Sequence, residues 1–162
     1  MVNEFSRFAR LPDIELKLGD LNRVIMDAVA AFERPSGNIE TETELADDLP
    51  AIMIDAEQMK RVFVNLMKNS AEAVSSNGGH ILIKTRHDIA RGLAIAEVAD
   101  DGRGISPADL QKLFQPYFST KGRGTGLGLA IVRRIISEHR GRINVAASQP
   151  TGAKFIIELP VN

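Results

Sequence analysis

The chain has 162 residues, no cysteine and a formal net charge of -1 at pH 7. This length is enough for one domain with its own core, and the lack of cysteine excludes disulfide bonds and thiolate metal sites. The scattered lysines and arginines argue against a nucleic-acid partner, and no apolar run reaches the ~20 residues of a membrane span.

The spacing of apolar residues predicts the helices and strands along the chain. Alternation indicates strands, and a three-to-four-residue spacing indicates helices. Asp20 and Asp55 are candidate N-caps, and Gln58 would complete a capping box with Asp55. In chain order we expect the end of a helix over 1–10, a strand over 14–18, a helix over 21–32, strands over 39–46 and 51–54, a long helix from 56 to about 75, strands over 80–87 and 93–99, a helical turn over 106–114, a helix over 125–139, and strands over 142–147 and 153–159.

This mixture of elements favours an α+β fold, because several strands follow one another directly in the sequence. We expect a two-layer α/β sandwich in which a mixed sheet is covered on one face by three helices. Residues 100–124 show little periodicity. A segment of that length inside a compact domain is typical of a functional lid or of disorder.

Three glycines at every second position, Gly124, Gly126 and Gly128, run directly into the predicted helix. Glycine lets the backbone approach a ligand closely, and the start of a helix turns unpaired N–H groups toward an anion. The pattern therefore predicts a phosphate site. A flexible loop is the alternative, because a glycine-rich segment is weak evidence when it stands alone.

Two asparagines on the long predicted helix, Asn65 and Asn69, point within about 40° of each other because they lie four residues apart. An asparagine carbonyl can bind Mg²⁺, which is otherwise held by water and phosphate oxygens. Glu72 lies near the same edge and could orient a water molecule or a ligand. The alternative is that these polar residues only face solvent.

Asp100 follows an apolar strand and precedes Gly102 and Gly104. A carboxylate at the end of a strand is well placed to accept a hydrogen bond from an exocyclic amine such as that of adenine. The alternative is an ordinary Asp-Gly turn between two elements. We assign no ligand role to the adjacent Asp101, which would point the opposite way.

Aromatic residues and cations precede the glycine-rich segment. Phe114, Tyr117 and Phe118 could anchor a lid or simply pack against the sandwich, while Lys121 and Arg123 could meet the β- and γ-phosphates. Two other lysines, at 68 and 112, are expected to be solvated. The three histidines, at 80, 87 and 139, occur singly and are read as structural.

These motifs together resemble the catalytic ATP-binding domain of sensor histidine kinases, in the superfamily that includes DNA gyrase, Hsp90 and MutL. The family's N box is matched by Asn65–Glu72, its G1 box by Asp100–Ile105, its F box by Leu113–Lys121 and its G2 box by Gly124–Leu129. The sequences of Asn69–Ala73 and Phe118–Gly126 are most similar to those of the nitrogen-regulation sensor kinases.

The resemblance implies a role for each matched residue. Asn69 would bind Mg²⁺, Asn65 would contact phosphate or metal, and Asp100 would recognise the adenine of ATP or ADP. Asn65, Asn69, Lys121 and Arg123 are the expected catalytic set. Further nucleotide contacts are expected from Glu72, Gly102, Gly104, Ile105, Phe118, Thr125, Gly126, Leu127, Gly128 and Leu129, with a lid from about 102 to 126 over the triphosphate.

Three departures from the family pattern refine this interpretation. ATP-hydrolysing relatives carry glutamate where this chain has Asn65, and an amide cannot take a proton from water, so we expect transfer without wasteful hydrolysis. The family's phosphoacceptor histidine box is absent. Residues 1–12 resemble the tail of the hairpin that carries this box, and residues 13–162 are expected to form the catalytic domain, which could not phosphorylate itself alone. Ala153 stands where many relatives have a threonine near the adenine.

The resemblance also implies partners and a location. We expect the dimerisation and histidine-phosphotransfer hairpin of the same parent as the acceptor, a response regulator further downstream, and a monomeric fragment. We expect a cytoplasmic domain, whether or not its parent is an inner-membrane sensor. A nucleotide-sensing module without transfer, or an anti-sigma-factor serine kinase of the same fold, are the alternatives.

Overall fold

The computed structural model describes residues 12–32, 38–74, 78–116, 118, 127–148 and 150–162. The helices there are α2 (Leu21–Ala31), α3 (Ala56–Ala73), the short α4 (Pro107–Leu110) and α5 (Gly128–Glu138). The strands are β1 (Lys17–Gly19), β2 (Ile39–Glu44), β3 (Ile52–Ile54), β4 (Gly79–Asp88), β5 (Leu93–Asp100), β6 (Arg142–Ala147) and β7 (Ala153–Pro160).

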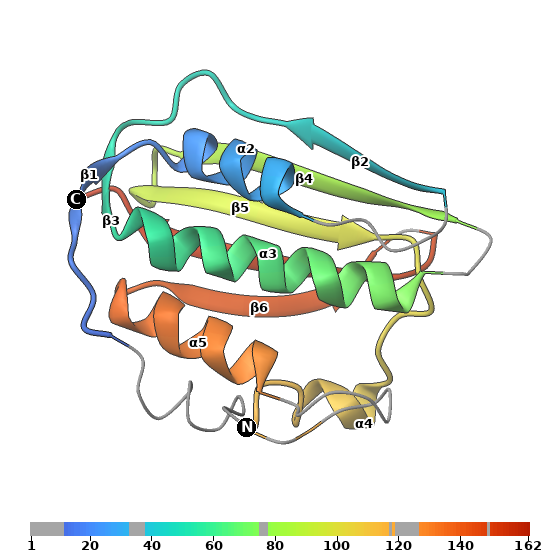
Figure 1. The fold of residues 1–162 in the computed structure, drawn as a ribbon. Coiled ribbons are helices and arrows are strands. Elements are labelled where there is room, and N and C mark those ends of the chain that lie inside the picture. The colour runs from blue at the N-terminus through green and yellow to red at the C-terminus, as the bar shows by residue number, and fades with distance from the viewer. Residues whose placement is uncertain (1–11, 33–37, 75–77, 117, 119–126, 149) are drawn as a thin grey trace.

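Five strands form one mixed sheet in the order β2-β4-β5-β7-β6. β2 runs parallel to β4, and the other neighbours are antiparallel. Helices α2, α3 and α5 lie side by side over one face of this sheet (Figure 1). The predicted fold class, a mixed sheet covered on one face by three helices, is confirmed.

The strands predicted over 14–18 and 51–54 do not join this sheet. The structure has β1 and β3 as a separate antiparallel pair. Each of these three-residue strands is followed almost at once by the N-cap of a helix, Asp20 for α2 and Asp55 for α3. The pair therefore lies at the end of the helical layer, where Leu18 is exposed to solvent.

Helix α3 forms where the sequence predicts it because its cap and its apolar arc agree. The Asp55 carboxylate accepts a hydrogen bond from the Gln58 amide at 3.2 Å, which satisfies one of the unpaired donors of the first turn. The helix ends at Ala73, two residues before the predicted end. Its buried apolar residues share one face: Met59, Val62, Phe63, Leu66 and Met67.

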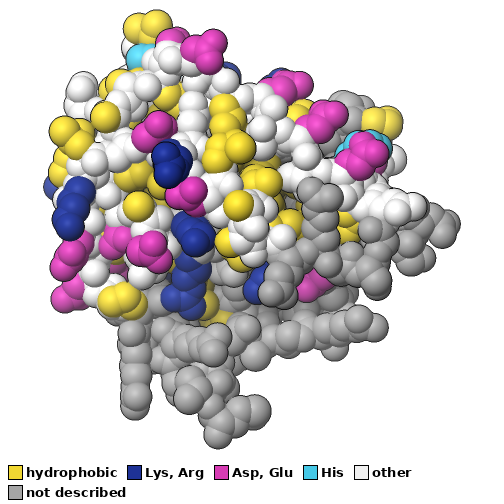
Figure 2. Space-filling view, turned by 45° about the horizontal axis from the view of Figure 1, so that its top comes forward, with side chains coloured by type: hydrophobic (Ala, Val, Ile, Leu, Met, Phe, Trp, Pro, Cys, Tyr) yellow, Lys and Arg dark blue, Asp and Glu magenta, His cyan; other side chains and the backbone are white. Residues whose placement is uncertain are grey.

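The core lies between the sheet and the three helices. In β7 every second residue is buried, namely Ala153, Phe155, Ile157 and Leu159, as expected for a strand with one covered face. Acidic and basic side chains are interspersed on the face of the molecule that Figure 2 shows, without a patch of one sign. No helix within the described ranges is long and apolar enough to cross a membrane.

His139 links the two helices that flank the candidate site. It is 3% exposed, and its Nδ1 lies 2.8 Å from the Ile135 carbonyl oxygen. Its Nε2 accepts a hydrogen bond from the Asp55 amide at 3.0 Å. Because a carbonyl can only accept and an amide can only donate, the ring is neutral with its proton on Nδ1. This histidine therefore fastens the end of α5 to the start of α3.

Candidate nucleotide-binding site

Asp100 is buried at the end of β5, with 4% of its surface exposed. Its Oδ1 accepts hydrogen bonds from the Gly102 amide at 2.9 Å and from the Ala153 amide at 3.3 Å. The Ser70 hydroxyl lies near enough to affect this carboxylate, but its oxygen makes no hydrogen bond of ordinary geometry among the described residues. The backbone amides of Gly102 and Ala153 are therefore the donors that bond Asp100 with ordinary geometry.

Burial raises the pKa of Asp100 above its ordinary value, and the two backbone amides offset only part of this effect. A buried carboxylate loses hydration that these neutral donors do not replace in full. The site thus holds an acceptor that gains from a further donor. An exocyclic amine of a nucleotide base is a donor of the required kind.

Gly152 supports Asp100 and was not identified from the sequence. Its φ is +106°, and a Cβ there would overlap the backbone carbonyl of Asp100 and lie 2.9 Å from Oδ1. A side chain at 152 would therefore displace the carboxylate. The signal was weak, because a glycine just before a strand usually indicates only a turn.

The loop after Asp100 packs against the end of α3. The Arg103 amide donates to the Ala73 carbonyl oxygen at 3.1 Å, and a Cβ on Gly102 would overlap that same carbonyl group. Gly104 has a φ of +79°, which favours glycine. Close packing thus explains Gly102, backbone conformation explains Gly104, and Ile105 is half-buried against the core.

Asn65 and Asn69 are half-buried on α3. The side-chain amide nitrogen of Asn69 donates to the backbone carbonyl oxygen of Asn65 at 3.2 Å. Since that backbone oxygen can only accept, the contact fixes which end of the Asn69 amide faces the helix, and the side-chain oxygen is the atom that could bind a cation. Glu72 lies exposed on the last turn of α3.

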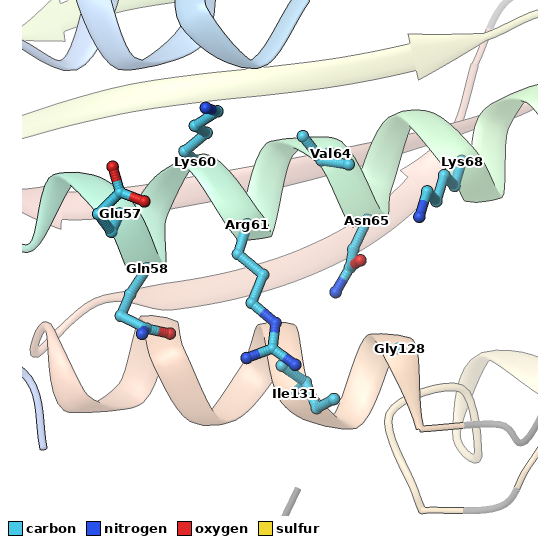
Figure 3. Close-up of a pocket in the computed structure, with 9 residues that line it drawn as sticks. All are labelled: Glu57, Gln58, Lys60, Arg61, Val64, Asn65, Lys68, Gly128 and Ile131. Atoms are coloured by element: carbon cyan, nitrogen blue, oxygen red, sulfur yellow. The ribbon is translucent and has the colours of Figure 1, made fainter. Parts of the chain in front are cut away.

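A groove of about 450 Å³ runs between α3 and α5, within the size range of small-molecule sites. Asn65 extends across it toward α5, and Gly128 lies at the first turn of α5 (Figure 3). A Cβ on Gly128 would meet no described atom within 4 Å. Packing against the described residues therefore does not account for this glycine, and a ligand would have room to lie against the start of α5 there.

The remaining residues predicted to contact the nucleotide differ in their burial. Leu127 and Leu129 are buried in the core cluster, so their side chains pack inside the protein. Phe118 is half-buried, and its amide donates to the Gln115 carbonyl oxygen at 3.2 Å. Six residues that the sequence assigns to the site or its lid lie outside the described ranges: Tyr117, Lys121, Arg123, Gly124, Thr125 and Gly126.

Asp101, to which we assigned no ligand role, anchors the start of β4. Its Oδ1 accepts from the His80 amide at 2.9 Å, and its Oδ2 lies 3.3 Å from His80 Nδ1. On its other side, His80 Nε2 lies 3.0 Å from a Glu40 carboxylate oxygen. The hydrogen bond with Asp101 raises the pKa of His80, and the backbone donor lowers the pKa of Asp101.

The candidate magnesium ligand among the described residues is a side-chain amide. Among the described residues there is no group of three His, Cys, Asp or Glu side chains that could hold a metal ion. The candidate donor is the Asn69 carbonyl, which suits a hard cation that keeps most of its water and binds phosphate. The residues present therefore fit Mg²⁺ bound together with a nucleotide.

Comparison with known proteins agrees with this geometry. A family model described as histidine kinase-, DNA gyrase B-, and HSP90-like ATPase matches residues 54–162. The chain belongs to this ATPase family. Over 164 residues this ATPase domain is 34% identical to the sensor histidine kinase ZraS of Escherichia coli O157:H7, in a match that covers 100% of the chain and 35% of ZraS.

Solved structures place this ATPase domain among the histidine kinases. Full-length ShkA in complex with AMPPNP matches 96% of the chain, and 33% of its own length, at 25% identity and a TM-score of 0.82. Histidine kinase ThkA in complex with the response regulator TrrA matches 98% of the chain, and 46% of its own length, at 28% identity and a TM-score of 0.82. The domain is thus an ATP-binding catalytic domain of the sensor histidine kinase type.

Proposed function

We propose that this domain binds Mg-ATP and transfers the γ-phosphate to a histidine on another domain of its parent protein. The observation that carries the proposal is the groove lined by both Asn65 and Gly128, along the helix whose C-terminal end contacts the loop after Asp100. The proteins it resembles support the histidine as acceptor, although the chain spans only 35% of ZraS.

Each part of the site has a distinct task. Asp100 would accept a hydrogen bond from the adenine amine, and guanine would be rejected because it presents a carbonyl at that position. The backbone at Gly128 would approach a phosphate closely, with the start of α5 directed at its charge. Asn69 would hold Mg²⁺, which supplies neutralisation of the phosphate charge when it is bound.

Asn65 suits transfer to a protein acceptor better than hydrolysis. Its amide can orient a phosphate oxygen or a bound water, but it cannot remove a proton from that water. The attacking imidazole of a histidine needs no such base, since its neutral nitrogen carries a lone pair. Alignment and charge neutralisation are then the main contributions that the protein makes to catalysis.

The expected partners follow from the same assignment. The hairpin that carries the acceptor histidine and forms the dimer would belong to the parent, and residues 1–12 would be its tail. A response regulator would receive the phosphoryl group from that hairpin, in line with the complex of ThkA with TrrA. The isolated domain would be monomeric, would bind ADP as well as ATP, and would lie in the cytoplasm.

A transfer assay tests the proposal. The chain is mixed with γ-labelled ATP, Mg²⁺ and a separate hairpin from the parent that contains its histidine, beside a hairpin with that histidine changed to glutamine. We expect acid-labile label on the first hairpin only, and none on the chain alone. Label on a serine protein, or nucleotide binding without transfer to any acceptor, would refute the assignment.

A further inference from the structure

Helix α3 sets the spacing of the residues along the candidate nucleotide site. The loop that follows Asp100 is fastened to the carbonyl of Ala73 at one end of α3. Asn69, Asn65 and Arg61 follow at intervals of four residues, which is about 6 Å each along the helix axis. A nucleotide with its base at Asp100 and its phosphates at Asn69 and Asn65 would therefore have its terminal phosphate on the side of Arg61.

Arg61 points the same way as Asn65. Positions four apart on a helix differ by about 40° in direction, and Figure 3 shows both side chains extending from α3 toward α5. Both line the groove, together with Gly128 and Ile131 of α5. Lys60, the adjacent cation, extends in the opposite direction in the same view.

The charge of the groove suits the end of a triphosphate. Its charged lining residues are three cations, Lys60, Arg61 and Lys68, and one acid, Glu57. The Arg61 side chain is half-buried, whereas Lys68 is exposed. A partly buried guanidinium can give two parallel hydrogen bonds to phosphate oxygens, and its charge is less screened than that of an exposed lysine.

We propose that Arg61 binds the γ-phosphate of ATP and makes the site prefer ATP to ADP. Arg61 lies outside the four matched sequence motifs, so this contact adds a residue to the site that those motifs do not include. It rests on the ATP site, and it requires nothing of the histidine acceptor. The same contact would be lost once the γ-phosphate has been transferred, which favours exchange of ADP for ATP.

Calorimetric titration of the chain with ATP and with ADP, both with Mg²⁺, tests this role. Arg61→Gln keeps a long helix-forming side chain and removes the charge. We expect it to weaken ATP binding about tenfold or more, the effect of a lost hydrogen bond to a charged group, and to change ADP binding less than twofold. Arg23→Gln on α2, the matched control outside the groove, should leave both affinities within twofold.

Several outcomes would overturn the assignment. Equal losses for ATP and ADP in Arg61→Gln would mean that the residue only supports the fold, and no loss would mean that it faces another group. An ATP-selective loss in Lys68→Gln instead would move the contact to that lysine. Absence of any ATP binding by the folded chain would remove the site itself.

Arg61→Lys serves as a second variant if the glutamine variant does not fold. It keeps the charge but loses the two-pronged geometry, so its ATP affinity should fall while its ADP affinity stays unchanged. The transfer assay is separate from these titrations. Histidine transfer could therefore fail while the preference for ATP stands.

Discussion

Replacement of Gly128 by alanine should separate ligand binding from folding. Gly128 is the first residue of α5 and lines the groove, and a Cβ there would meet no described atom within 4 Å. Glycine in a helix costs roughly 0.5–1 kcal/mol relative to alanine. We therefore expect the free energy of unfolding of the nucleotide-free domain to stay the same or to rise by up to about 1 kcal/mol.

ATP binding should change in the opposite direction. The added methyl group would occupy the space in which a phosphate approaches the backbone at the start of α5. Loss of a hydrogen bond to a charged group costs about 1.5–3 kcal/mol, which is roughly a tenfold to hundredfold loss of affinity. Calorimetric titration with Mg-ATP and urea denaturation followed by circular dichroism would measure the two quantities on the same preparation.

Gly102→Ala is the matched control, since its Cβ would overlap the carbonyl of Ala73. Overpacking of this kind typically costs about 1–3 kcal/mol, so this variant should lose both stability and binding. The reasoning fails if Gly128→Ala binds ATP as tightly as the unchanged chain. It also fails if the variant is destabilised as much as Gly102→Ala.

Four further predictions concern Asp100, Asn69 and His139. Asp100→Asn should weaken ATP binding at least tenfold, because an amide donor would face the adenine amine, without lowering the stability of the nucleotide-free domain; the same titration and denaturation check both. For the unchanged chain, ATP affinity should fall as the pH falls through the raised pKa of Asp100. The loss should therefore begin at a pH above 3.8, the ordinary pKa of an aspartate. Titrations across pH would contradict this if the loss began only below that pH. Asn69→Ala should make ATP affinity insensitive to Mg²⁺, and a persistent dependence on Mg²⁺ would exclude Asn69 as the ligand. His139→Ala should lower the free energy of unfolding by about 2–4 kcal/mol, through a cavity and an unsatisfied amide, and a loss below about 1 kcal/mol by urea denaturation would show that the link is weak.

Local signals in the sequence predicted local structure well. Asp20 and Asp55 cap the helices that they were expected to begin, because a cap depends on residues three positions away. The predicted sandwich is confirmed for a similar reason, since alternation and helical spacing are properties of single segments. The separate pairing of β1 with β3 could not be predicted, because sheet membership depends on where the chain travels between strands.

Contacts between distant residues could not be read from the sequence. His139 binds the amide of Asp55, which lies 84 residues away, and His80 pairs with Asp101 across 21 residues. Both histidines were expected to be structural, but their partners became visible only in the fold. Gly152 is a third case, because its importance comes from the Asp100 backbone that packs against it.

Asp100 and Gly128 are two positions at which the domain gives up stability where a ligand would bind. A carboxylate whose pKa is raised by burial destabilises the folded state at pH values above that pKa, since the unfolded chain holds the ionised form more readily. Gly128, whose added Cβ would meet no described residue, lowers the stability of α5 without improving its packing against those residues. Bound nucleotide would return this stability by mass action, about 2.7 kcal/mol at a concentration one hundred times the Kd.

The two positions act on different parts of the nucleotide, Asp100 on the base and Gly128 on a phosphate. ADP should therefore stabilise Asp100→Asn less than it stabilises the unchanged domain. Inorganic phosphate alone should stabilise Asp100→Asn as much as the unchanged domain, but should stabilise Gly128→Ala less.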